Sequence, residues 1–93
     1  MIVISHDAFN QTKGWRSIIV IPLSTSEAQA GRGPSAVLLP SGTAGLSKDT
    51  VALCHQVTTL DRSKLSQRIG ELNSTELRQV EDGLKAAMDL HWI

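Results

Sequence analysis

Four short apolar runs, rich in valine and isoleucine, most constrain what this chain can fold into. The runs occupy residues 1–5, 17–24, 36–39 and 50–57, and their length and β-branched composition are typical of strands. The loops between them are built from turn-forming residues, and none contains a helix long enough to join parallel strands. Successive antiparallel strands are the simplest arrangement, so we predict a small curved antiparallel sheet or barrel.

The spacing of the apolar residues changes near the end of the chain, where we predict a helix. The members of a stripe with helical spacing are Leu77, Val80, Leu84, Ala87 and Met88. Asn73, followed three residues later by Glu76, has the spacing of a capping box at a helix start. The predicted fold is therefore mainly β with α, in one domain over residues 1–93 that ends in a C-terminal helix.

Composition excludes several classes of protein. The nine lysines and arginines balance nine aspartates and glutamates, whereas a basic nucleic-acid-binding domain usually carries a net positive charge. This balance hides an asymmetry, because residues 1–68 carry a net charge of +3 and residues 69–93 one of −3. The single cysteine, Cys54, excludes a disulfide framework and cysteine-rich zinc sites and fits a reducing cytoplasm. No apolar run approaches the roughly 20 residues of a membrane span.

A meander of alternating strands brings a set of polar residues to one end of the sheet. The predicted members of this end are Ser24, Thr25, Arg32, His55, Gln56 and Thr58, with Arg62 and Lys64 directly following. Arg16 and the 41–49 loop are expected at the opposite end. Hydroxyls, an imidazole, an amide and cations suit a phosphodiester backbone with splayed bases. RNA is cleaved without a metal when its own 2′-OH attacks the adjacent phosphorus and the protein stabilises the charge.

Two side chains near this pattern have competing interpretations. His55 is either a surface or hydrogen-bonded histidine or a ligand contact, and the first is the commoner case. Trp15 is expected in the core or packed beside the turn that precedes it. The alternative, a base-stacking role, is the less common case because its predicted position is far from the polar end. Cys54 lies in an apolar strand, which is typical of a buried, inert thiol.

Several segments, taken together, resemble the MazF/PemK (Kid-like) family of toxins from toxin–antitoxin systems. The distinctive pieces are Pro22-Leu23-Ser24-Thr25, Gly45-Leu46-Ser47-Lys48-Asp49 with Val51-Ala52-Leu53, and Gln56 ahead of Thr59-Leu60-Asp61-Arg62. The likeness covers essentially the whole chain in the family's order. It implies a small SH3-like antiparallel barrel of the CcdB/MazF type with helices, usually as a homodimer.

The resemblance also implies an activity and partners. Members of the family are cytoplasmic, metal-independent, sequence-specific endoribonucleases that cut single-stranded mRNA, and they need no cofactor. Their MazE-like antitoxin lays an acidic C-terminal segment across the RNA groove. Ser24 matches a position where the family usually has threonine, and Gln56 matches a residue that commonly contacts bases, with His55 and Thr58 flanking it.

The family's other catalytic residue is an arginine in a loop ahead of the strand matched by residues 1–5. This sequence begins after that loop, which leaves two alternatives: either the start of the chain is misplaced, or Arg32 or a basic residue from 62–68 supplies the charge. Ser24, Thr25 and Arg32 are then the predicted catalytic set, and His55, Gln56, Thr58, Arg62 and Lys64 the predicted RNA-binding set. The alternatives are a module that binds RNA or antitoxin and cuts weakly, and, on fold alone, a gyrase-poisoning toxin.

Overall fold

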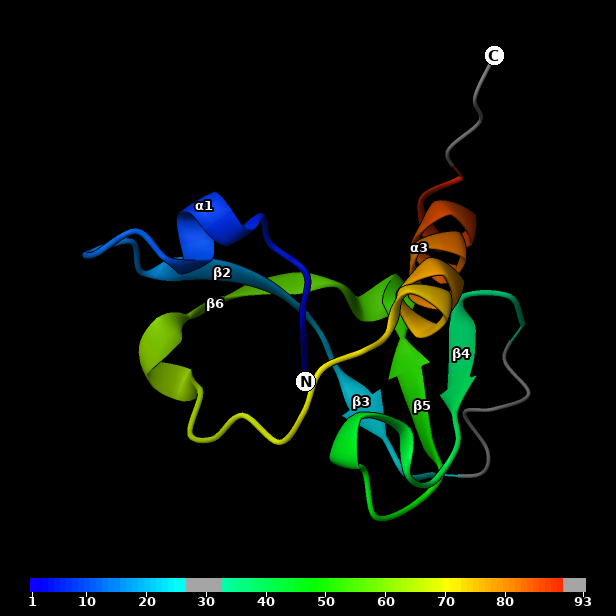
Figure 1. Ribbon diagram of the computed structural model, residues 1–93. Coiled ribbons are helices and arrows are strands. Elements are labelled where there is room, and N and C mark those ends of the chain that lie inside the picture. Colours follow the sequence, from blue (N-terminus) through cyan, green and yellow to red (C-terminus); the bar gives the residue numbers. More distant parts are fainter. Residues whose placement is uncertain (27–32, 90–93) are drawn as a thin grey trace.

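The computed structural model describes residues 1–26 and 33–89. Its strands form two three-stranded antiparallel sheets, which lie side by side (Figure 1). The first sheet, sheet A, has the order β1 (Ile2–Val3), β2 (Ser17–Ile21), β6 (Thr58–Asp61). The second, sheet B, has the order β3 (Leu23–Ser24), β5 (Thr50–Leu53), β4 (Ala36–Leu39). The mainly antiparallel architecture predicted from the sequence is confirmed.

One long bent strand pair connects the two sheets. The predicted strand 17–24 is split at Pro22, which has no backbone N–H to donate to a sheet. Its halves pair with different strands, because Val20 lies opposite Thr58 whereas Leu23 lies opposite Ala52. The resulting shift in register is taken up by a short 3₁₀ turn, η2 (Cys54–Gln56), so the predicted strand 50–57 ends at Leu53.

The predicted meander order is wrong in one respect. Both β3 and β4 run antiparallel to β5, which lies between them, so β3 and β4 run in the same direction. The connection from Ser24 to Ala36 must therefore return the chain from one end of sheet B to the other. This return reverses the expected positions of the later strands, and it separates residues that a simple meander would have brought together.

The C-terminal helix, α3 (Ser74–Met88), begins with the predicted capping box. The Asn73 side chain accepts from the Glu76 N–H, and the Glu76 carboxylate accepts from the Asn73 N–H, each at 2.8 Å. The helix packs against β4 and η2, beside sheet B (Figure 1). Val80 is fully buried at this contact, whereas Leu77 and Met88 from the predicted apolar stripe are exposed.

Gly83 allows this helix to approach the sheet closely. A Cβ added there would lie 2.5 Å from Cγ2 of Val37 and 2.8 Å from Sγ of Cys54, which is closer than any unstrained contact. The buried cluster at this contact consists of Ile21, Leu39, Ala52, Cys54 and Val80. The core thus lies between α3 and sheet B and extends to the end of β2.

Three further short helices complete the described part of the chain. The helix α1 (Asp7–Asn10) follows β1, and the 3₁₀ turns η1 (Thr43–Gly45) and η3 (Arg62–Lys64) follow β4 and β6. Residues 65–73 run from η3 to the start of α3 and pass η1 so closely that a Cβ on Gly45 would lie 2.5 Å from the carbonyl oxygen of Ile69. Among the described residues, no helix is long and apolar enough to cross a membrane.

Candidate nucleic-acid interface

Ser24 lies at the end of β3, where the chain leaves sheet B. Its backbone pairs with Val51, and its side chain is half-buried. The Ser26 N–H donates to Ser24 Oγ at 3.1 Å, so the turn fixes the position of the hydroxyl oxygen. The hydroxyl hydrogen is left to be donated elsewhere. Thr25, the next residue, is exposed.

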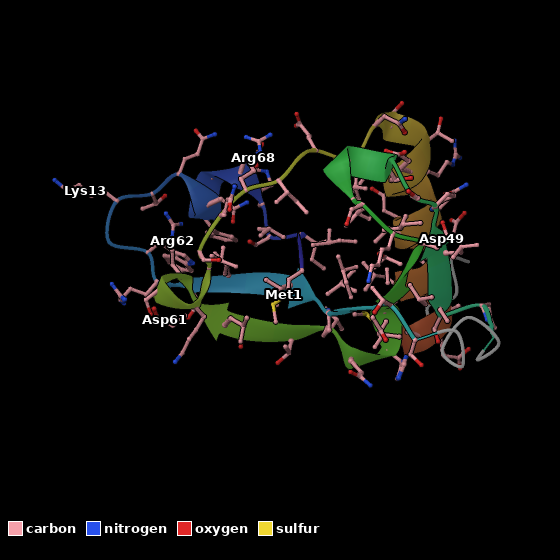
Figure 2. The ribbon with its side chains drawn as sticks, turned by 90° about the horizontal axis from the view of Figure 1, so that it is seen from below. Met1, Lys13, Asp49, Asp61, Arg62 and Arg68 are labelled. Atoms are coloured by element: carbon pink, nitrogen blue, oxygen red, sulfur yellow. The ribbon has the colours of Figure 1, made fainter. Side chains whose placement is uncertain are left out.

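The 41–49 loop lies at this same end of sheet B, which the sequence did not predict. Leu38 and Ser24 both pair with Val51, so the chain enters this loop next to the end of β3. Local hydrogen bonds hold the loop, with the Ser41 N–H donating to Asp49 Oδ1 at 2.8 Å. Figure 2 shows Asp49 at the end of the molecule opposite to Asp61.

His55 and Gln56 occupy η2, at the bend between the two sheets. Both side chains are exposed, and their Nε2 atoms lie 3.3 Å apart. Thr58 follows at the start of β6 and is also exposed. From Val51, the partner of Ser24, to His55 is four residues, or about 13 Å along an extended strand. The predicted base-reading residues are therefore adjacent to one another but separate from Ser24.

Arg62 and Lys64 lie at the far end of β6, beside Arg16, and this corrects the expected grouping. The Arg62 N–H donates to the Arg16 carbonyl at 2.6 Å. The Arg62 guanidinium donates through Nη2 to the carbonyl oxygen of Phe9 at 3.1 Å. The two cations thus lie at the end of sheet A, because β6 carries the chain away from η2 and from Ser24.

A bidentate ion pair between Arg16 and Asp61 lies at the same end of sheet A. Arg16 Nε and Nη2 lie 3.0 and 2.8 Å from the two carboxylate oxygens of Asp61. Hydrogen bonds from Arg16, and then from Ser63, hold the pKa of the Asp61 carboxyl well below its usual range. The Asp61 carboxylate also accepts from the Ser63 N–H at 2.9 Å, so it caps η3.

Arg32 and Cys54, which the sequence analysis singled out, add no side chain to the site that the structure describes. Arg32 lies outside the residues that the structure describes. Cys54 is fully buried, as predicted, its thiol lies 3.7 Å from the Val80 carbonyl oxygen, and burial raises the pKa of the thiol. Within residues 1–26 and 33–89, no group of three or more His, Cys, Asp or Glu side chains could hold a metal ion.

Trp15 lies beside the turn that precedes it, which is one of the two positions predicted for it, and not in the core. Its side chain is 42% exposed, outside the core, and it stacks on Phe9 of α1 with ring centroids 4.8 Å apart and planes at 17°. The signal in the sequence was the pair of aromatic residues close to Lys13 and Arg16 within the segment 6–16.

The fold is a small antiparallel structure with a C-terminal helix, and comparison with known proteins gives the family. A family model described as "PemK-like, MazF-like toxin of type II toxin-antitoxin system" matches residues 1–88. The chain belongs to this family.

Individual relatives agree with this membership. The chain is 33% identical over 92 residues to "Endoribonuclease MazF9" of Mycobacterium tuberculosis, with 96% of this chain and 76% of that protein aligned. It is 28% identical to "Endoribonuclease MazF6" of the same species, over 97% of this chain and 77% of the relative.

Solved structures share the fold. "Mycobacterium tuberculosis toxin MazF-mt6" superposes with a TM-score of 0.82 at 19% identity, covering 98% of this chain and 86% of that one. A structure titled "Endoribonuclease in complex with its cognate antitoxin from Mycobacterial species" gives 0.77 at 20% identity, covering 98% and 81%. The CcdB/MazF-type fold predicted from the sequence is confirmed.

Proposed function

We propose that this MazF-like toxin is a sequence-specific, metal-independent endoribonuclease that cleaves single-stranded mRNA. Its relatives MazF6 and MazF9 are named endoribonucleases. The observation that carries the proposal is the Ser24 hydroxyl, whose oxygen is held by the Ser26 N–H at the end of a strand. A positioned hydroxyl of this kind can donate to a phosphate oxygen without reorganising during the reaction.

The reaction is a transphosphorylation within the RNA. The 2′-OH loses its proton and attacks the adjacent phosphorus, and the bond to the 5′-oxygen breaks as that oxygen gains a proton. The products are a 2′,3′-cyclic phosphate and a 5′-hydroxyl. Ser24 donates to a non-bridging oxygen, Thr25 supports it from the same turn, and a cation such as Arg32 balances the charge of the phosphorane.

The bases next to the cleaved bond are read by the exposed side chains at the bend between the sheets. Gln56 offers both donors and an acceptor, and His55 and Thr58 flank it. Hydrogen bonds to base edges need an unpaired strand, whose bases can be turned outward. Arg62 and Lys64 contact phosphates farther along the strand, because they lie at the far end of β6.

The partners proposed are a MazE-like antitoxin and a second copy of this chain. The structure of a related endoribonuclease with its cognate antitoxin supports the first. An acidic C-terminal antitoxin segment would be attracted by the net charge of +3 on residues 1–68. We place the activity in the cytoplasm, where mRNA is available.

Cleavage of single-stranded RNA in EDTA tests this function. We expect defined fragments that end in a 2′,3′-cyclic phosphate, detected by mass spectrometry. Upstream fragments whose new 3′ end at the cut carries a hydroxyl, with a 5′-phosphate on the downstream fragment, would contradict the mechanism. Tight RNA or antitoxin binding without any fragments would favour the alternative of a binding module.

A further inference from the structure

An exposed aromatic stack lies at the end of sheet A, far from Ser24. Phe9 and Trp15 are 44% and 42% exposed although they stack on each other. They are two of only three aromatic residues in the chain, which has one phenylalanine, two tryptophans and no tyrosine. His6 meets the Phe9 ring edge-on, with centroids 6.3 Å apart. Large apolar rings exposed together on a small domain usually mark a binding surface.

The stack is held in place by hydrogen bonds on both sides. The Arg62 guanidinium bonds the carbonyl oxygen of Phe9, which ties η3 to α1. The side chain of Asn10 donates to the carbonyl oxygen of Ser5 at 2.8 Å, which ties α1 to the end of β1. The backbone N–H of Trp15 donates to the carbonyl oxygen of Thr12 at 3.1 Å, which closes the turn between the two rings. The rings therefore form a preorganised surface.

Positive charge surrounds the aromatic stack. The cations of this end are Lys13, Arg16, Arg62 and Lys64, and its acids are Asp7 and Asp61. Figure 2 shows Arg62, Asp61 and Lys13 at the end where α1 lies. The Asp61 carboxylate is already bonded by Arg16, so the remaining cations are not neutralised by it. An anionic ligand with flat rings matches both properties of this end.

We propose that Phe9, Trp15 and the cations around them form a platform on which an unpaired base of single-stranded RNA stacks while its phosphates meet the cations. This inference rests on the proposed function, and it adds a second RNA contact that is separate from the cleavage residues. Aromatic side chains beside a positively charged track are how proteins hold single strands without reading sequence. Seven residues of strand separate Ser24 from Ser17, so the platform lies up to about 23 Å from the site of chemistry.

This separation fixes what the platform does. A base stacked there belongs to a nucleotide flanking the cleaved bond, so it contributes affinity and does not take part in the reaction. Besides the phosphate contact proposed for it above, Arg62 positions the stack, because its guanidinium holds the backbone of Phe9. Lys13 and Lys64 are exposed and contact phosphate directly.

Fluorescence and binding measurements with defined RNA test the platform. The protein is Ser24→Ala in a Trp92→Phe background, so that nothing is cleaved and Trp15 is the remaining tryptophan. The probes are an oligoadenylate of about ten nucleotides, within the range that small single-strand-binding domains cover, and a strand of equal length without bases. We expect oligoadenylate to quench Trp15 fluorescence and the abasic strand to leave it unchanged.

Substitution separates stacking from charge. Trp15→Leu should weaken oligoadenylate binding by about 5- to 100-fold, the effect of losing one stacked base, with little change for the abasic strand. Trp15→Phe should retain most of the affinity. Lys64→Gln should weaken both probes alike, whereas Arg78→Gln on the exposed face of α3 should affect neither.

Two results would overturn the platform and leave the proposed function intact. One is oligoadenylate binding without quenching of Trp15. The other is equal binding of oligoadenylate by proteins with and without Trp15→Leu. A loss of affinity for a protein partner alone in Trp15→Leu would count in the same way. If the protein that retains Trp15 and Lys64 binds no RNA at all, the proposed function fails together with the platform.

Discussion

The two ends of this small barrel present different chemistry. The end of sheet B, at Ser24 and the 41–49 loop, presents the Ser24 hydroxyl on a turn and a loop that local hydrogen bonds hold. The end of sheet A presents two stacked aromatic rings and several cations. The first set suits the stabilisation of a reacting phosphate, and the second suits holding a strand. Under the two proposals above, cleavage and affinity belong to separate places along one bent strand pair.

The two ends also differ in how they are supported. Sheet B is backed by α3, which packs on η2 and β4 with Gly83 against Val37 and Cys54 over the buried cluster. The sheet A end depends on hydrogen bonds between short elements, such as Arg62 to Phe9 and Arg16 to Asp61. Damage to the helix contact should therefore affect the two ends unequally.

The largest expected effect is the loss of cleavage in Ser24→Ala. Removing a single positioned donor to a reacting oxyanion typically lowers kcat by about 100- to 1,000-fold. RNA affinity should remain, because the platform and the base-reading residues are unchanged. Ser26→Ala is the matched control, since the donor to Ser24 is the backbone N–H of Ser26. Rates in EDTA measure both variants, and undiminished cleavage by Ser24→Ala would refute its role.

Gly83→Ala should destabilise the protein at the sheet B end. The added Cβ would lie 2.5 Å from Val37 Cγ2, and overpacking of this kind costs about 1–3 kcal/mol. This exceeds the gain of about 1 kcal/mol in helix propensity. Urea denaturation measures the loss, and hydrogen exchange should show it first in β4 and β5. Gln79→Ala on the exposed face of α3 is the control. An equal loss of hydrogen-exchange protection in β1 and β2 would contradict the inference that α3 supports sheet B more than sheet A.

Asn73→Ala should have a smaller effect on the same helix. It removes the side-chain acceptor for the Glu76 N–H, and losing such a cap costs about 1 kcal/mol. Ser74→Ala, one residue farther on, keeps the capping box and should be nearly neutral. Thermal unfolding compares the two, and equal stability of both variants would show that the capping box contributes nothing.

The smallest predicted effect concerns the ion pair at the sheet A end. The pKa of the Asp61 carboxyl is lowered by its bonds to Arg16 and Ser63, so the associated stability is present above the ordinary aspartate pKa of about 3.9. It is lost as the pH falls through the lower folded-state value. The stability difference between wild type and Arg16→Gln should thus shrink in acid, and the Asp61 pKa should rise in the variant. A carboxyl NMR titration with no change in pKa would exclude this coupling.

Much of the fold could be predicted from local signals. The capping box at Asn73 and the four β-branched runs needed only the sequence near them. Strand direction could not be predicted, because it depends on the long connection from Ser24 to Ala36, whose composition does not specify where it returns. The split at Pro22 was visible in principle, since proline interrupts strand pairing.

The residues of the candidate site stay a prediction, and the arrangement predicted for them was partly wrong. Ser24 and Gln56 were found through resemblance to the family. Their grouping with Arg62 was wrong, because the register shift at η2 was not visible and β6 carries Arg62 to the other end. Trp15 was assigned to packing because exposure depends on tertiary structure, which composition does not report.

The central claim is that RNA is cleaved at one end of the molecule and bound by the platform at the other. Its most direct test compares kcat and KM for two variants on one single-stranded RNA in EDTA. For Ser24→Ala, we predict a kcat lowered about 100- to 1,000-fold with KM nearly unchanged. For Trp15→Leu, we predict an unchanged kcat with KM raised about 5- to 100-fold. If both substitutions lower kcat to the same extent, the two ends act as one site and the account is wrong.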